Sequence, residues 1–346
     1  MNDAPSNEEP RNGDTQKIID FHTHIASGMC FPPSFNDGVV DNMTVALTSR
    51  GLPVTRDKVA RMHAGTLTDP LCDELVKQMD EAAISESVLL LPDFTYALRD
   101  STHSIEELID HHRAVVERHP GRFRVLVGVD PRWGADGLAL FERAVVEYGF
   151  DGMKLYPPCG YQLSDERLYP YYEICAQYSL PVLSHIGATS PVLDFEIAQP
   201  IYVDKAARDF PGIDFVLAHG SVHYPDEVAM LCNNRPNVYV DVSGYEAFGA
   251  TALRTLFSRG INHKVLFGTD WPVFRLQGRQ LSLVEKLEKE GAFPESMSDA
   301  DRDLFFHGNA ARLLGKNKLK QAASGPTAPP FLPSLPTPVN EGLRRV

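Results

Sequence analysis

The chain has few features that would link it to a membrane or to a nucleic acid. Its 346 residues include 33 Lys and Arg against 46 Asp and Glu, which gives a net charge of −13. This acidic balance disfavours nucleic acid and anionic membrane surfaces as partners. No apolar run approaches the length of a membrane span, and residues 1–16 lack the apolar core of a signal peptide. We therefore expect a cytoplasmic protein whose residues 1–16 form a disordered tail.

Cysteine is scarce and scattered along the chain. No Cys-x-x-Cys pair occurs, and the number of cysteines is odd, which argues against a disulfide framework and against a thiolate zinc site. The five cysteines are Cys30, Cys72, Cys159, Cys175 and Cys232. Their pattern indicates a reducing compartment.

Short apolar segments alternate with helical segments along most of the chain. Eight segments are expected as strands, at residues 17–25, 87–92, 123–129, 151–156, 180–185, 213–220, 238–242 and 263–272. Buried strands interleaved with helices predict a parallel sheet covered on both faces. Eight such strand–helix units favour a sheet that closes into a barrel. No Gly-x-Gly-x-x-Gly follows any of them, which disfavours the alternative of an open, doubly wound sheet. The pattern therefore predicts an α/β fold, a (β/α)8 TIM barrel over residues 17–315.

Two stretches depart from this alternation. Residues 26–68 contain Pro32-Pro33 and Asn36-Asp37-Gly38, and a connection of this length is usually functional or disordered. We expect a substrate-covering insertion there, with one short helix at residues 56–64. Six prolines between Pro326 and Pro338 predict an extended chain, so residues 316–346 are expected to form a Pro-rich C-terminal tail.

Polar side chains stand at the ends of several predicted strands. His22 and His24 follow an apolar run, and their i, i+2 spacing places both imidazoles on one face of a strand. Imidazole nitrogen is a good ligand for zinc and its first-row neighbours. The same relative place on later strands is taken by Lys154, Tyr156, His185, His219 and Asp270. Because the active site of a (β/α)8 barrel lies at the carboxyl ends of its strands, we expect these residues to meet at one site.

These motifs, taken in order, resemble a known family. They are Asp20-Phe21-His22-Thr23-His24, Gly152-Met153-Lys154-Leu155-Tyr156-Pro157-Pro158, His185, Ala218-His219-Gly220 and Phe267-Gly268-Thr269-Asp270-Trp271-Pro272. They are similar to the amidohydrolase superfamily, and in particular to its amidohydrolase family 2 branch of TIM-barrel metal-dependent hydrolases. That branch also holds aminocarboxymuconate semialdehyde decarboxylase and γ-resorcylate decarboxylase. The resemblance covers about residues 17–315.

The resemblance implies a site with one metal ion. By it, one Zn²⁺ would be bound by His22, His24, His185 and Asp270, with Mn²⁺ as an alternative, and His219 would act as acid/base. Three imidazoles and a carboxylate leave one coordination position open for water, whose pKa zinc lowers to about 7. Asp270 can then accept the proton of that water, and His219 can stabilise an oxyanion or protonate a leaving group. Asp20 is expected to satisfy backbone hydrogen bonds rather than to bind metal.

The role of Lys154 is open on the sequence alone. With Tyr156 on the same strand face it could bind a substrate carboxylate. In binuclear members of the superfamily a strand-four lysine is instead carboxylated and bridges two metals, and His185 and His219 would then bind the second. A third reading is a lysine that extends out of the barrel into solvent.

Further candidates flank the strand ends. Arg132 and His223 could reach a substrate, although a surface ion pair is an alternative for Arg132. Four other histidines fall in or beside a helical pattern and are expected at solvated positions: His103, His111, His112 and His119.

The leading functional hypothesis is a hydrolase that uses zinc-activated water on a small carbonyl substrate, a carboxylate-bearing amide or lactone. The first alternative is a non-oxidative decarboxylase that uses the same metal site. The second is an inactive barrel that binds a ligand or partner. The family resemblance and the Pro-rich tail are also compatible with a homodimer.

Overall fold

The computed structural model describes residues 17–323. The predicted N-terminal tail and the proline-rich residues 324–346 lie outside the described residues. No helix within the described part of the chain is both long enough and apolar enough to span a membrane.

Eight parallel strands form one sheet in chain order. They are β1 (Ile18–Thr23), β4 (Ile84–Leu91), β5 (Phe123–Val127), β6 (Gly152–Leu155), β7 (Val182–Ser184), β8 (Phe215–Leu217), β9 (Val238–Asp241) and β10 (Val265–Leu266). An isolated parallel bridge between Thr23 and Trp271 joins the first strand to the last, and Phe21 N donates to Phe267 O at 2.9 Å. The sheet therefore closes on itself, and the predicted TIM barrel is confirmed.

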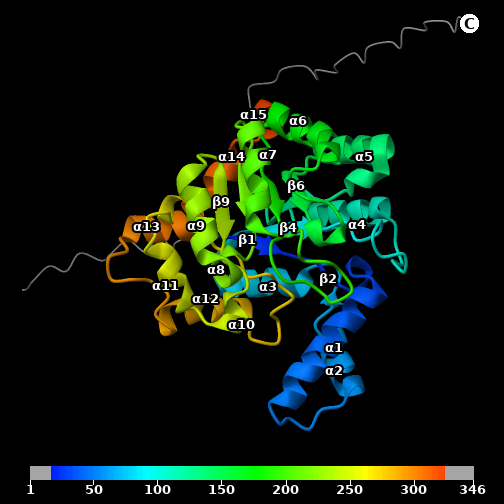
Figure 1. Cartoon of the computed structure of the whole chain (residues 1–346), viewed down its shortest axis with the longest axis vertical. Helices are drawn as coiled ribbons and strands as arrows, with labels where there is room; N and C mark the ends of the chain where they lie inside the picture. The colour runs from blue at the N-terminus through cyan, green and yellow to red at the C-terminus, as the bar shows by residue number, and fades with distance from the viewer. Residues whose placement is uncertain (1–16, 324–346) are drawn as a thin grey trace, which may run out of the picture.

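Helices surround the strands (Figure 1). They are α3 (Asp73–Glu81), α4 (Ile105–Arg118), α5 (Gly134–Val146), α6 (Tyr169–Tyr178), α7 (Val203–Asp209), α8 (Gly220–His223), α9 (Pro225–Asn234), α10 (Tyr245–Phe248), α11 (Ala252–Phe257), α12 (Gln280–Lys289), α13 (Asp299–Asp303) and α14 (Asn309–Gly315). Helix α4 begins at Ile105, where Ser104 and Glu107 form a capping box.

Side chains of each strand alternate between two apolar layers. On β4, Val88 and Leu90 belong to the cluster inside the barrel, whereas Leu89 and Leu91 pack in the larger cluster that faces the helices. This period of two is the one expected of strands buried on both faces. The apolar layer fills the inside of the barrel, and polar side chains lie at the carboxyl ends of the strands.

The insertion after β1 differs from its prediction. The short strands β2 (Ala26–Ser27) and β3 (Thr68–Asp69) pair at its base, and α2 (Arg56–Ala64) has the predicted bounds. The sequence reading missed α1 (Pro33–Ser49), a helix of 17 residues that projects from the barrel beside α2 (Figure 1). Only Gly38 and Val40 of α1 are buried, so the helix carries no broad apolar stripe by which it could be recognised.

The C-terminal boundary also differs. Helical structure continues beyond Gly315 into α15 (Lys318–Ala323), where Lys320 Nζ lies 2.5 Å from Asp151 Oδ1 at the start of β6. Asn317, between the two helices, is buried. Helical structure therefore continues past the predicted tail boundary at residue 316, and the extent of the Pro-rich tail stays a prediction.

Candidate metal centre

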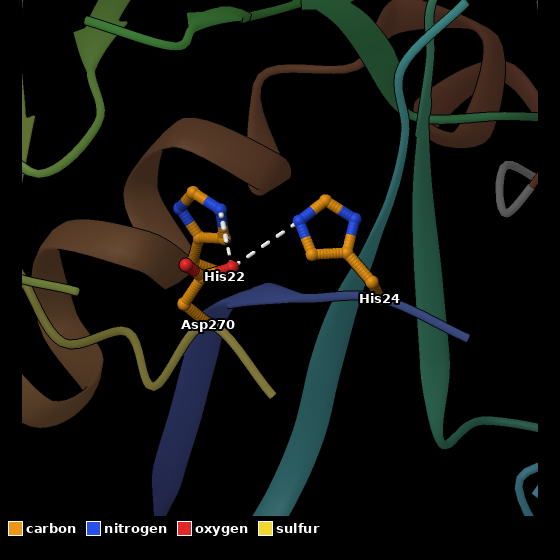
Figure 2. A group of neighbouring side chains, drawn as sticks. All are labelled: His22, His24 and Asp270. Atoms are coloured by element: carbon orange, nitrogen blue, oxygen red, sulfur yellow. Dashed lines mark ion pairs between the residues drawn. The ribbon is translucent and has the colours of Figure 1, made fainter. Parts of the chain in front are cut away.

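Three predicted ligands converge at the carboxyl end of the barrel. Asp270 Oδ1 lies 3.4 Å from His22 Nε2 and 3.3 Å from His24 Nε2, and Figure 2 shows both rings turned toward the carboxylate. The ligand atoms of the three residues all lie within 4.8 Å of one another. All three residues are buried.

A register shift at the end of β1 turns His22 toward the barrel mouth. The register between β1 and β4 shifts between Asp20 and Thr23. Although Asp20 and His22 are two residues apart, Asp20 contacts Gln280 of α12, whereas His22 contacts Asp241 inside the barrel mouth. The shift therefore places the two side chains on different faces of the strand.

Asp20 ties together the backbone segments that carry the ligands. It accepts hydrogen bonds from His22 N at 3.2 Å, from Thr269 N at 3.0 Å and from Thr269 Oγ1 at 2.6 Å. Asp270 N in turn donates to His22 O at 2.7 Å. The expectation that Asp20 satisfies backbone hydrogen bonds is confirmed.

The hydrogen bonds of the two imidazoles set their tautomers. His24 Nδ1 lies 2.7 Å from Leu90 O, and because a carbonyl only accepts, Nδ1 must carry the proton. His22 Nδ1 lies 2.8 Å from Asp241 Oδ2, and its buried Nε2 has no hydrogen-bond partner among the described residues. In their neutral forms both imidazoles would turn an Nε2 lone pair toward Asp270, which is the arrangement that a divalent metal requires of histidine ligands.

The charge states of these groups also fit a metal. Burial lowers the pKa of His22 to about 4. Burial opposes ionisation of Asp270, but His22 and His24 outweigh it and lower its pKa to about 2. At neutral pH the group is therefore a carboxylate beside unprotonated imidazole, the form in which these side chains bind metal.

His219 lies beside this group. It follows β8 with φ 58° and precedes α8, and its ring centroid is 4.7 Å from that of His22 and 4.9 Å from that of His185. Its Nδ1 is 2.8 Å from Ser243 Oγ. The predicted acid/base residue therefore stands at the site with Nδ1 already engaged.

Sequence reasoning missed Asp241 and Ser243. Asp241 is the last residue of β9 and is fully buried. Burial opposes its ionisation, but contacts with His22 and His219 hold the pKa of Asp241 below its ordinary value. Its place at the end of a predicted strand is the same signal that identified the other residues, so it could have been included.

His185 lies near the predicted metal site but not within the close group of ligand atoms. Its Nε2 lies 3.0 Å from Ala188 O, so this nitrogen donates to the carbonyl and only Nδ1 remains for a metal. Its ring stacks on Tyr156 with centroids 4.4 Å apart. Among the described residues, His185 is not in the group whose ligand atoms lie within 4.8 Å of one another, so its role as a ligand stays a prediction.

Lys154 points into the barrel. It is 1% exposed, which excludes the reading in which it extends into solvent. Burial lowers the pKa of its ammonium to about 8, against the opposing effect of Asp241 and Asp270. Its Nζ lies 6.0 Å from the ring centroid of Tyr156, and the Tyr156 hydroxyl is 2.7 Å from Thr189 Oγ1.

The structure does not bring Arg132 and His223 into the metal group. Arg132 donates to both carboxylate oxygens of Asp130, at 2.8 and 2.6 Å, and to Cys159 O at 2.6 Å. His223 is exposed and packs against Phe248, with ring centroids 5.5 Å apart. The ion-pair alternative for Arg132 describes its observed contacts.

A row of aromatic rings borders the site. Phe31 of the insertion is 6.0 Å from His24 between ring centroids, and 6.2 Å from Phe94 after β4. Phe94 is 4.9 Å from Tyr156, which stacks on His185. An apolar wall therefore runs from one predicted metal ligand to another.

Comparison with known families decides the classification. The family model described as amidohydrolase (Amidohydro_2) matches residues 19–316. The chain belongs to this amidohydrolase family. No curated protein matches it.

Several solved structures share the amidohydrolase fold with this chain. An uncharacterised TIM-barrel protein from Bordetella bronchiseptica is 21% identical, with 87% of this chain and 99% of that chain covered and a TM-score of 0.61. A 2,6-dihydroxybenzoate decarboxylase from Rhizobium is 16% identical, with 87% and 98% covered and a TM-score of 0.60. A dihydroxybenzoic acid decarboxylase from Polaromonas sp. JS666, with bound manganese and 2-nitroresorcinol, is 20% identical, with 87% and 98% covered and a TM-score of 0.60.

Proposed function

We propose that this amidohydrolase is a divalent-metal-dependent, non-oxidative decarboxylase of a small, planar carboxylic acid. The observation that carries the proposal is Lys154, a side chain 1% exposed that points into the barrel and has no hydrogen-bond or ion-pair partner among the described residues. Burial disfavours the charged form of its ammonium, and a substrate carboxylate would stabilise that form. The aromatic row from Phe31 to Tyr156 favours a flat, apolar substrate body.

The roles of the other residues follow from their positions. The metal would be held by the predicted set His22, His24, His185 and Asp270. A bound divalent ion supplies Lewis-acid stabilisation of negative charge on a substrate oxygen. His219 would first take up a proton on Nε2 from solvent and then deliver it to the substrate carbon. The bond from that carbon to the carboxylate breaks, its electron pair stays on the carbon and binds the proton, and CO2 leaves.

The comparisons support this choice over the hydrolase hypothesis. Two of the structurally similar proteins are, by name, decarboxylases of dihydroxybenzoic acids, and one of these contains manganese. Zn²⁺ is the proposed ion here and Mn²⁺ is its alternative. Hydrolysis remains a second candidate because Asp270 is held ionised and can accept a proton from an attacking water.

The reaction is tested with the full chain, loaded with Zn²⁺ or Mn²⁺ and incubated with aromatic and aliphatic carboxylic acids and with carboxylate-bearing amides and lactones. We expect CO2 release from an aromatic acid, and we expect Asp270→Asn to abolish it. Asp93→Asn, which changes another buried carboxylate at a strand end, is the control and should retain activity. Product formation from an amide or lactone without CO2 would establish the hydrolase instead, and a wild-type protein that binds no metal would overturn both.

A further inference from the structure

One buried carboxylate contacts both histidines that the proposed chemistry uses. Asp241 Oδ2 accepts from His22 Nδ1 at 2.8 Å, and Asp241 Oδ1 accepts from His219 N at 3.2 Å. Asp241 and Ser243 are each 0% exposed, so water does not compete for these bonds.

Ser243 links Asp241 to the imidazole of His219 through a chain of two hydrogen bonds. Its hydroxyl donates to Asp241 Oδ1 and lies 2.8 Å from His219 Nδ1. Since the hydroxyl hydrogen is used on Asp241, the oxygen of Ser243 accepts from His219, and Nδ1 of His219 carries the proton. The carbonyl oxygen of Ser243, 3.2 Å from the same nitrogen, accepts as well.

We propose that Asp241 and Ser243 are positioning residues that hold His22 and His219 in the same Nδ1–H tautomer. One carboxylate then directs two Nε2 lone pairs toward the centre of the site, one of them for metal binding and the other for proton transfer. The inference rests on the proposed function for the role of each lone pair, but the tautomers themselves do not depend on it.

The chemistry of an amide explains why asparagine should not replace Asp241. Both carboxylate oxygens accept hydrogen bonds: Oδ2 from His22, and Oδ1 from the backbone of His219 and of Ser243, the latter at 3.0 Å. An asparagine has only one acceptor oxygen, so its NH2 group would face either the His22 Nδ1–H or these backbone N–H groups. Either arrangement leaves a buried donor unpaired or changes a tautomer.

Metal affinity gives the first readout, measured on the full-length protein by competition with a chromophoric chelator for Zn²⁺. We expect Asp241→Asn to weaken binding by about 10- to 100-fold, the usual cost of losing the partner of a histidine ligand. Asp93→Asn is the matched control, because Asp93 is a buried carboxylate at a strand end that bonds Thr95 and Trp133 rather than a site imidazole. Equal affinities in the two variants would contradict the proposed role of Asp241.

The tautomers give a second readout that needs neither metal nor turnover. In metal-free protein labelled with ¹⁵N-histidine, we expect His22 and His219 to carry their proton on Nδ1. Ser243→Ala should change the tautomer of His219 and leave that of His22, and it carries the test if Asp241→Asn does not fold. Ser184→Ala removes another buried hydroxyl at a strand end, one that bonds the backbone of His185, and it should leave both tautomers unchanged.

The two proposals fail in different ways. A wild-type protein that binds no metal but shows both Nδ1–H tautomers overturns the metal site and keeps the positioning role. A wild-type protein that binds metal while both tautomers persist in Asp241→Asn and in Ser243→Ala overturns the positioning role alone.

Discussion

Backbone conformation at single residues points to the same site as the side chains do. Five non-glycine residues have positive φ in the described chain, and two of them are His219, at 58°, and Asp270, at 48°. Residues with side chains rarely adopt this region, and in folded proteins such outliers cluster at functional sites. His219 comes shortly after β8 and Asp270 shortly after β10, so the local turn at each residue aims its side chain into the barrel mouth.

His112 shows how burial changes the behaviour of one residue. The helical pattern predicted a solvated position, and this prediction is wrong, because His112 is 1% exposed and its Nδ1 donates to Leu108 O. Burial lowers its pKa from 6.5 to about 3. Between these values the unfolded chain binds a proton that the folded chain does not, so the free energy of unfolding falls as pH falls, by up to about 1.4 kcal/mol per pH unit.

Replacing this side chain should therefore make the fold less sensitive to acid. We expect His112→Gln to reduce the slope of unfolding free energy against pH between about pH 6 and pH 4, measured by urea denaturation. His111→Gln is the control, because His111 is its partly exposed neighbour on α4. The prediction would be wrong if both variants kept the wild-type slope.

Helix α1 of the insertion contacts the connection from β7 to α7. Ser190, in the connection from β7 to α7, donates to Phe35 O in α1 at 2.9 Å. A Cβ placed on Gly38 of α1 would lie 2.4 Å from Ser190 Oγ and 2.9 Å from Pro191 Cδ. Glycine at this position therefore allows α1 to approach the loop that continues from the strand carrying His185.

Gly38→Ala should separate these two elements. Alanine favours a helix over glycine by about 1 kcal/mol, so destabilisation would come from the contact with Ser190 and Pro191, where overpacking costs about 1–3 kcal/mol. We expect a lower melting temperature and a lower kcat/KM, with metal content unchanged.

Gly28→Ala provides the comparison, since a Cβ at Gly28 meets nothing within 4 Å. If Gly38→Ala were as stable and as active as Gly28→Ala, the contact between α1 and the β7–α7 connection would contribute neither to stability nor to activity.

At the scale of the whole molecule, the site lies across the line where the barrel closes. His22 and His24 belong to the first strand and its end, and Asp270 follows the last strand. The two strands meet through the Thr23–Trp271 bridge, beside which His24 N donates to Trp271 O at 2.6 Å. A metal bound by these residues would link both sides of the closure.

Metal binding should therefore stabilise the whole fold. A ligand present at 100 times its dissociation constant stabilises the folded state by about 2.7 kcal/mol, so we expect Zn²⁺ to raise the melting temperature of the metal-free protein by several degrees. Asp270→Asn should lose this increase, and Asp93→Asn should keep it. An equal increase in Asp270→Asn would show that the ion binds elsewhere.

The sequence by itself determined the barrel and the grouping of His22, His24 and Asp270 at its mouth. Apolar segments and their spacing are local properties, and burial of both sheet faces leaves few other arrangements for eight strand–helix units. The meeting of His22, His24 and Asp270 follows from that topology, because parallel strands bring their carboxyl ends to one edge.

Only the tertiary structure decided which side chains contact one another. The register shift in β1 separates Asp20 from His22, and Asp241 acquires its role only by facing His22 across the barrel. Burial of His112 and the packing of α15 likewise depend on neighbours distant in sequence. The physical reason is that hydrophobic periodicity specifies which helices and strands form. Hydrogen-bond partners depend instead on strand register and on backbone turns, which the hydrophobic pattern of a short segment does not predict.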